Sequence, residues 1–189
     1  MRFLLVLGVA LCCFFAASAF STAHRPGKLN PNHVPSSACV DMVPVHNDSV
    51  ASSDPAPYVL TPSVSQANPG DVIQVVTSGI NGAKFKGLYM QARVVGAGVD
   101  AVGKFMQENE ERSPAVRISS CPPGEKNAVS YISRTGIETI TIDWRVPENL
   151  PEGMHNVYFR ATFLESFSRF WVNVDSEPIF ISSDGHQKH

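Results

Sequence analysis

Two cysteines in the body of the chain have the residue type and setting for disulfide chemistry. The sequence has 189 residues and four cysteines, and Cys12 and Cys13 lie inside an apolar N-terminal stretch that we expect to be removed. Cys39 and Cys121 then remain, and in an oxidising compartment an isolated pair has one intramolecular connectivity. The alternative is two free buried thiols. A cysteine-based zinc site is disfavoured because positions so far apart lack the short paired spacing of zinc modules.

The six histidines do not form a recognisable metal-binding or catalytic set. None is paired at metal-ligand spacing on an expected strand. His46, close to Pro44, is expected to anchor the N-terminal segment, with a functional role as the alternative. The histidines of the polar tail could bind a metal weakly, although a solvated tail explains them more simply. We therefore expect no metal and no cofactor; the histidines are His24, His33, His46, His155, His186 and His189.

The common catalytic motifs are missing from the sequence. It contains no Gly-x-Ser-x-Gly nucleophile elbow, no His-Glu-x-x-His zinc motif and no Gly-x-x-x-x-Gly-Lys-Ser/Thr phosphate loop. The glycine-rich stretch from Gly96 to Gly103 has the wrong spacing for a dinucleotide fingerprint, so an inter-strand loop explains it better. We expect a protein that is not an enzyme.

Three further features could take part in modification or binding. Asn47-Asp48-Ser49 is an N-glycosylation acceptor in a loop-like region, so a glycan at Asn47 is sterically possible, although the motif often occurs by chance. The charged run Gln107 to Arg112 is expected to be a solvated loop rather than an acidic docking patch. Phe163 and Trp171 are expected in the core, whereas Phe167 stands at a tight turn and is a candidate for an exposed apolar contact.

The first nineteen residues have the features of a secretory signal peptide. Arg2 supplies the positive start, Phe3 to Phe15 is almost entirely apolar, and Ala17-Ser18-Ala19 is a small-x-small cleavage site. The apolar run is shorter than the about 20 residues of a spanning helix. The C-terminal tail is polar, so a lipid anchor is also disfavoured. We expect a secreted, extracellular protein that begins near Phe20 and does not insert stably into membranes.

The composition excludes several classes of protein. The chain has 15 Lys+Arg against 17 Asp+Glu, a formal net charge of -2 and 43% hydrophobic residues. It is too apolar and too weakly charged for a disordered chain. It also lacks the basic excess that nucleic-acid binding requires. The same near-neutral charge argues against a membrane-disrupting peptide, which needs a basic amphipathic helix.

The elements that must position these residues are short β-strands. Residues Ser21 to Pro57 are rich in Pro, Ser, Asn and His and are expected to form an extended N-terminal arm, tied down at Cys39. A turn is possible at Lys104 to Glu111. Strands are expected at Val72–Thr77, Gly87–Val95, Ala128–Ile132, Ile137–Val146, Met154–Leu164, Phe170–Val174 and Ile179–Ile181. This series predicts an all-β fold, an antiparallel β-sandwich of two sheets.

The strand Gly87 to Val95 illustrates the pattern. Leu88, Met90, Ala92 and Val94 share one face, which should belong to the core. Tyr89, Gln91 and Arg93 share the other face. A period of two is typical of a half-buried strand.

The order of motifs along the chain resembles the reeler (reelin N-terminal) domain over residues Cys39 to Ile181. The most specific motifs are Phe-Lys-Gly-x-x-x-Gln-Ala-Arg, at 85–93, and the Ala-Thr…Phe-Trp-Val series, at 161–172. The layout of the whole chain is similar to that of the small secreted insect defence proteins. The motifs are Cys39 to His46, Pro57 to Leu60, Asn68 to Asp71, Phe85 to Arg93, Cys121, Ile142 to Pro147, Val157 to Thr162 and Phe170 to Val172.

The resemblance implies an immunoglobulin-like sandwich in a secreted protein of innate immunity. Proteins of this group are described as antimicrobial, and the family offers no catalytic residues. The implied partners are microbial surface components, or host cell-surface or extracellular proteins. The alternative is an interaction module of the extracellular matrix or cell surface without an immune role. The expected division is a signal peptide at 1–19, an arm at 20–38, a reeler domain at 39–181 and a polar tail at 182–189.

One departure from the family pattern matters. Some reeler domains have several disulfides, whereas this chain keeps a single pair, Cys39 and Cys121, once its signal peptide is removed. The difference does not threaten the fold. It weakens the case for a partner of the matrix type.

Overall fold

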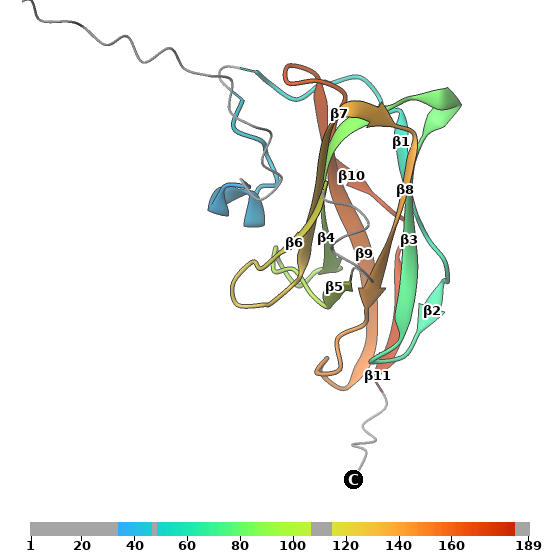
Figure 1. The fold of residues 1–189 in the computed structure, drawn as a ribbon. Coiled ribbons are helices and arrows are strands. Elements are labelled where there is room, and N and C mark those ends of the chain that lie inside the picture. Colours follow the sequence, from blue (N-terminus) through green and yellow to red (C-terminus); the bar gives the residue numbers. More distant parts are fainter. Residues whose placement is uncertain (1–33, 47–48, 107–114, 184–189) are drawn as a thin grey trace, which may run out of the picture.

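Alternation of apolar and polar residues makes most of the chain into strands that form two sheets packed face to face (Figure 1). The computed structural model describes residues 34–46, 49–106 and 115–183. The first sheet has the order β1-β3-β8-β5, with β1 Tyr58–Pro62, β3 Val72–Gly79, β8 Thr139–Arg145 and β5 Lys104–Met106. The all-β sandwich expected from the sequence is confirmed.

The second sheet has seven strands in the order β2-β11-β9-β4-β7-β6, with β10 also paired to β9. Its long central strands are β9 Gly153–Leu164 and β4 Phe85–Val94, which pair antiparallel from Gly87↔Leu164 to Val94↔Val157. The pairing of β2 with β11 is parallel, and the other pairs of the sheet are antiparallel. The remaining strands are β2 Gln66–Ala67, β11 Ile179–Ser183, β7 Ala128–Ile137, β6 Val116–Ser119 and β10 Phe170–Asp175.

The turn expected at Lys104 to Glu111 is wrong at its start. Lys104–Met106 forms β5, whose Lys104 pairs with Arg145 of β8. Residues 107–114 lie outside the described part. The strand expected at Ile137–Val146 is present as β8, Thr139–Arg145, whereas β7 extends beyond the expected Ala128–Ile132 and ends at Ile137. A three-residue strand is too short to show alternation in a sequence.

Aromatic side chains fill the space between the two sheets. The Tyr58 ring stacks on Phe163 with centroids 4.5 Å apart and meets Trp171 edge-on at 5.4 Å. Trp144 meets Phe159 edge-on at 5.1 Å farther along the same core. Edge-to-face and stacked pairs add about 0.5–1.5 kcal/mol each beyond the area they bury. Phe163 and Trp171 are buried, so their expected place in the core is confirmed.

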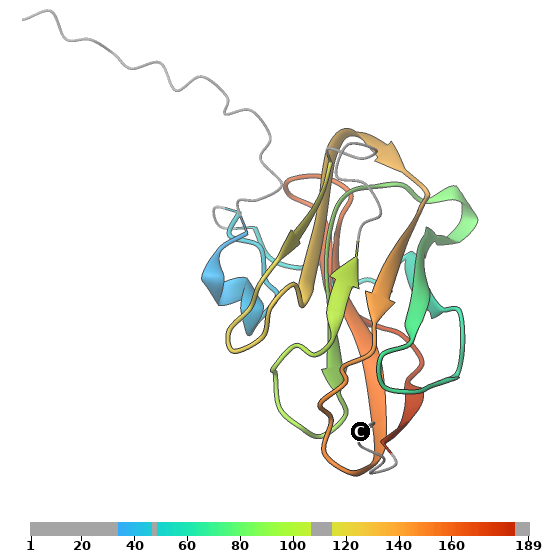
Figure 2. The same cartoon turned by 60° about the horizontal axis from the view of Figure 1, so that its bottom comes forward.

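The expectation that β4 is a half-buried strand is wrong. Both of its faces are buried, because the N-terminal arm, which here means the described segment before β1 (residues 34–46 and 49–57), covers the outer face that carries Tyr89, Gln91 and Arg93. The arm contributes a short 3-10 helix, η1 Ser36–Cys39, which lies outside the sandwich beside β6 and β4 (Figures 1 and 2). A second such helix, η2 Ile80–Gly82, follows β3. In the described residues, no helix has the length and apolar character needed to cross a membrane.

Candidate binding surface at the β9–β10 turn

The turn between β9 and β10, residues 165–169, is held in one shape by its own hydrogen bonds. The backbone N–H groups of Glu165 and Ser166 donate to the Arg169 carbonyl at 3.0 and 3.2 Å. The Arg169 N–H donates to the Ser166 hydroxyl at 3.1 Å. Between these residues stands Phe167, whose side chain is 59% exposed. An exposed aromatic ring is thus presented by a fixed backbone.

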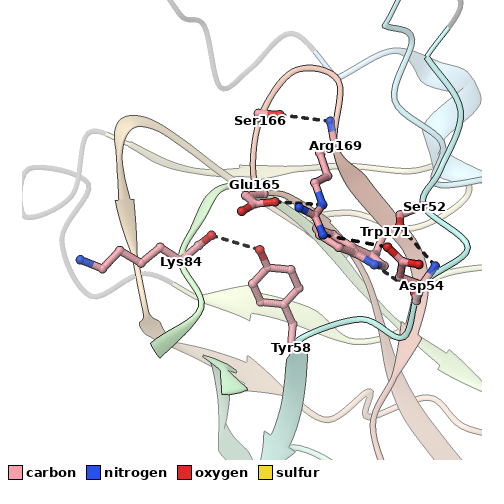
Figure 3. A network of polar contacts seen from close by, with 8 residues as sticks. All are labelled: Ser52, Asp54, Tyr58, Lys84, Glu165, Ser166, Arg169 and Trp171. Atoms are coloured by element: carbon pink, nitrogen blue, oxygen red, sulfur yellow. Dashed lines mark hydrogen bonds and ion pairs between the residues drawn. The ribbon is translucent and has the colours of Figure 1, made fainter. Parts of the chain in front are cut away.

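A polar network ties this turn to the end of the arm and to the core (Figure 3). Arg169 Nε lies 3.2 Å from a Glu165 carboxylate oxygen, and the guanidinium lies 5.2 Å from the centre of the Trp171 ring. The Trp171 indole N–H donates to the Asp54 carbonyl at 3.1 Å, and the Ser52 N–H donates to the Phe170 carbonyl at 2.8 Å. The exposed ion pairs add little stability. Their effect is to order the charged side chains around the turn.

His46 joins the arm to the turn through an aromatic contact. Its ring stacks on Phe167 with centroids 4.2 Å apart and meets Phe170 edge-on at 5.8 Å. Its Nδ1 is buried without a hydrogen-bond partner among the described residues. Burial lowers the pKa of His46 below the ordinary 6.5, and the backbone of Phe167 opposes this in part. The neutral imidazole therefore packs as an aromatic ring, consistent with an anchoring role.

Apolar side chains are exposed on both segments that the His46–Phe167 contact joins. On the arm, Val45 is 75% exposed and Val50 is 81% exposed, and Val43 is exposed beside them in the sequence. We call Phe167 and these three valines the apolar tip. A single exposed apolar residue is ordinary on a protein surface. The His46–Phe167 contact joins the two segments that carry these residues, and exposed apolar residues that gather on a surface are typical of an interaction site.

The arm is fixed to the second sheet by the disulfide and by the polar residues of β4. Cys39 and Cys121 are bonded, with Cα atoms 5.4 Å apart. The Gln91 side-chain amide donates to the Cys39 carbonyl at 3.3 Å, and Arg93 Nη2 donates to the Val40 carbonyl at 3.1 Å. The alternating pattern of β4 places both side chains on one strand face, but it does not show that they hold the arm. The available signal was the Gln-x-Arg spacing, which puts both on that face.

A cleft of about 290 Å³ lies far from the turn, where β5 begins and β8 ends. Lys104 and Arg145 stand opposite each other on its wall, and Glu125 and Glu148 also line it. Because cations and carboxylates line the cleft together, its charge does not select one class of ligand. We therefore favour the apolar tip as the candidate binding surface.

Several residues singled out in the sequence lie outside the described residues: Asn47, the run Gln107 to Arg112, and His24, His33, His186 and His189. His155 lies within them, and its Nε2 is 2.6 Å from the Pro151 carbonyl oxygen. In the described ranges, no group of three or more His, Cys, Asp or Glu residues is placed to hold a metal ion. Gly96 and Gly98 lie in an exposed loop with positive φ, as the loop interpretation predicts.

Comparison with known proteins identifies the relatives of this chain. It is 41% identical over 173 residues to a "Putative defense protein" of Locusta migratoria, an alignment that covers 92% of this chain and 91% of that protein. It is 32% identical over 179 residues to a "Putative defense protein" of Bombyx mori, covering 93% and 99%. A "Putative ferric-chelate reductase 1 homolog" of Drosophila melanogaster is 24% identical and is covered over only 24% of its length.

Solved structures show the same fold. The human F-spondin reeler domain superposes with a TM-score of 0.54 at 16% identity, covering 70% of this chain and 94% of that one. A structure of the Reelin-N domain of F-spondin gives 0.53 at 17% identity, covering 71% and 93%. The reeler-domain family model matches residues 37–187. Together with the defence-protein relatives, this match supports a defence-related extracellular role, and the chain belongs to the reeler-domain family.

Proposed function

We propose that this protein is a secreted, non-catalytic binding protein that acts in defence by attaching to components of microbial surfaces through the apolar tip. The observation that carries the proposal is Phe167, an exposed aromatic ring on a turn whose backbone is fixed by its own hydrogen bonds. Aromatic residues on rigid backbone lose little entropy on binding, and they dominate many interfaces.

The surroundings of Phe167 favour recognition over catalysis. His46, the nearest titratable aromatic group, is packed between Phe167 and Phe170 and has no hydrogen-bond partner on Nδ1 in the described chain. A general base needs a partner proton within hydrogen-bond reach and a pKa near the working pH. The imidazole here supports the exposed ring from behind instead.

Charge favours attachment over membrane lysis. Removal of the signal peptide would take away Arg2 and change the formal net charge from -2 to -3. Peptides that disrupt anionic membranes rely on a basic amphipathic helix. Recognition or opsonisation is therefore the defence mechanism that we propose.

The test is binding of the purified mature protein to intact bacteria and to isolated cell-wall polymers. Phe167→Ser should weaken binding by about 10-fold or more, as loss of a central aromatic contact does. Phe180→Ser is the matched control, since Phe180 is also exposed but lies on β11. Equal binding by wild type and a matched unrelated protein would overturn the proposal, as would equal losses in the two variants.

Binding to host cells or matrix glycoproteins in place of bacteria would favour the alternative, an extracellular interaction module without an immune role. Transcript levels before and after bacterial challenge separate the two functions independently of binding. An increase supports defence, and constant developmental expression supports the alternative.

We also propose export by cleavage after Ala19 and glycosylation at Asn47. Asn47 follows His46 directly, so a glycan there would adjoin the segment that supports Phe167. N-terminal sequencing of protein collected from insect-cell medium should begin at Phe20. Digestion with an N-glycosidase should reduce the mass of the wild type and leave that of Asn47→Gln unchanged.

A further inference from the structure

We propose that the Cys39–Cys121 disulfide is a site of thiol exchange, at which a small thiol becomes attached to Cys39 while Cys121 leaves as a stabilised thiolate. The two sulfurs have different surroundings. Cys121 is buried, with 3% of its surface exposed, whereas Cys39 is partly exposed. Because exchange depends on which sulfur an attacking thiolate can reach, the greater exposure of residue Cys39 favours attack there.

A chain of hydrogen bonds ends on the Cys121 sulfur. Arg93 donates from Nη2 and Nε to the Gln91 side-chain carbonyl at 2.8 and 3.1 Å. Gln91 Nε2 donates to the Tyr89 hydroxyl oxygen at 3.0 Å and lies 3.4 Å from Cys121 Sγ. The Tyr89 hydroxyl lies 3.2 Å from the same sulfur. Since a disulfide sulfur carries no proton, the hydroxyl is the donor in that contact.

The charged residue at the start of these hydrogen bonds, Arg93, has unusual surroundings. Arg93 is 2% exposed, and in the described part of the protein no carboxylate lies within ion-pair distance of it. Its other partners are the carbonyl oxygens of Cys39 and Val40. A buried cation and donors aimed at a sulfur favour the thiolate form. Burial alone would favour the neutral thiol. Burial would therefore raise the pKa of a Cys121 thiol, whereas the buried cation and the donors would lower it.

The exchange balances without an added oxidant or reductant. The sulfur of the incoming thiolate bonds to Cys39 Sγ, and the electron pair of the Cys39–Cys121 bond goes to Cys121 Sγ. The proton lost by the small thiol passes to solvent. One disulfide is consumed and one is formed, and the Cys121 thiolate is stabilised by Tyr89 and Gln91. A leaving thiolate of lower pKa departs faster.

The consequence would be release of the covalent clamp on the arm. The arm would then be held by the carbonyl contacts of Gln91 and Arg93, by the Thr162 hydroxyl bond to the Met42 carbonyl and by apolar packing. The same arm carries His46, which supports Phe167. Thiol exchange would thus act on a segment that reaches the apolar tip.

The first experiment treats the folded, full-length mature protein with reduced glutathione as the probe thiol. Free thiols are then alkylated, and both cysteines are mapped by mass spectrometry. We expect the glutathione adduct on Cys39 and the alkyl group on Cys121. An adduct mainly on Cys121, or a reaction that proceeds only at the rate of global unfolding, would overturn the proposal.

The second experiment removes the hydroxyl that faces the leaving sulfur. Tyr89→Phe should slow adduct formation by about 3- to 10-fold, as expected for loss of one hydrogen bond to a developing thiolate. Tyr131→Phe is the matched control, because the Tyr131 ring is also buried but packs in the main core, edge-on to Phe85. Equal rates of adduct formation in the two variants would show that the hydrogen bonds to the Cys121 sulfur have only a structural role.

A third measurement keeps the proposal testable if Tyr89→Phe does not fold. In Cys39→Ser, Cys121 is a free thiol, and its pKa can be followed through thiolate absorbance in the ultraviolet. The proposal expects a value below the ordinary thiol pKa of about 8.5. A higher value would mean that burial prevails over the polar chain, and it would exclude assisted exchange.

Discussion

Gly103 illustrates how a single residue type is fixed by its surroundings. Its φ of +68° is a left-handed conformation, and a Cβ at this position would lie 2.3 Å from Trp144 Cζ2, inside the core. Gly103→Ala should therefore lower the free energy of unfolding by about 2–4 kcal/mol, combining backbone strain with overpacking. Chemical denaturation of the two proteins measures the difference.

Gly96 provides the control for that substitution. Its φ is +79°, and no heavy atom lies within 4 Å of the position that a Cβ would take. Gly96→Ala should cost about 1–2 kcal/mol, the price of left-handed backbone alone. If Gly96→Ala lowered the free energy of unfolding as much as Gly103→Ala, the contact with Trp144 would not explain the cost at Gly103.

His46 should make stability depend on pH. Its pKa in the folded protein is lowered by burial, whereas in the unfolded chain it takes the ordinary value near 6.5. The unfolded chain therefore binds the proton more readily, so the stabilisation is present above about pH 6.5 and is lost as the pH falls through the lowered pKa. His46→Phe keeps an aromatic ring and removes the charge. Its melting temperature should fall less than that of the wild type between pH 7.5 and 5.

The comparison is made as the difference between the wild type and His46→Phe, so that contributions common to both proteins cancel. If His46→Phe and the wild type lose the same stability on acidification, the imidazole is not buried in the neutral form.

At the scale of elements, the arm covers the outer face of β4 and is held there by one covalent bond, the Cys39–Cys121 disulfide. The disulfide joins positions 82 apart, and it closes over a small second core that includes Met42, Tyr89 and Ala128. Replacing both cysteines with Ala should lower the free energy of unfolding by about 2–5 kcal/mol, the usual range for a native disulfide that closes a long loop. Unchanged stability would mean that the non-covalent contacts of the arm suffice.

The same elements show what a sequence can and cannot predict. Residues 154–164 alternate over many positions, and β9 lies where that pattern predicts it. β5 and β2 could not be predicted, since strands of three and two residues depend on neighbours distant in the chain. The burial of the outer face of β4 could not be predicted either, because the arm that covers this face lies about fifty residues earlier in the sequence.

The candidate surface was predictable only in parts. The tight turn marked Phe167 as a possible exposed contact, and the proximity of His46 to Pro44 suggested an anchor. Their stacking could not be foreseen, because no local pattern relates the arm to a turn more than a hundred residues later. Pattern analysis identifies the faces of strands, whereas contacts between distant loops arise from the assembled sandwich.

At the scale of the whole molecule, charge and shape make distinct predictions about binding. The formal net charge of the full chain is -2, and the apolar tip consists of one phenylalanine and three valines. Contact made by apolar surface is not weakened by salt, whereas contact made by exposed charges is screened over about 10 Å at 0.1 M ionic strength. Binding to bacteria should therefore change by less than about 3-fold between 0.05 and 0.5 M NaCl.

Vesicle leakage separates attachment from lysis in the same preparation. Vesicles of anionic lipid that contain a fluorescent dye should release none of it at protein concentrations that saturate binding to bacteria, because the formal net charge of -2 gives the chain no basic excess to attack an anionic membrane. A cationic lytic peptide serves as the positive control. Leakage that increases with protein and falls with salt would indicate an electrostatic attack on the membrane. Salt-resistant binding that is lost in Phe167→Ser, without leakage, would assign attachment to the apolar tip.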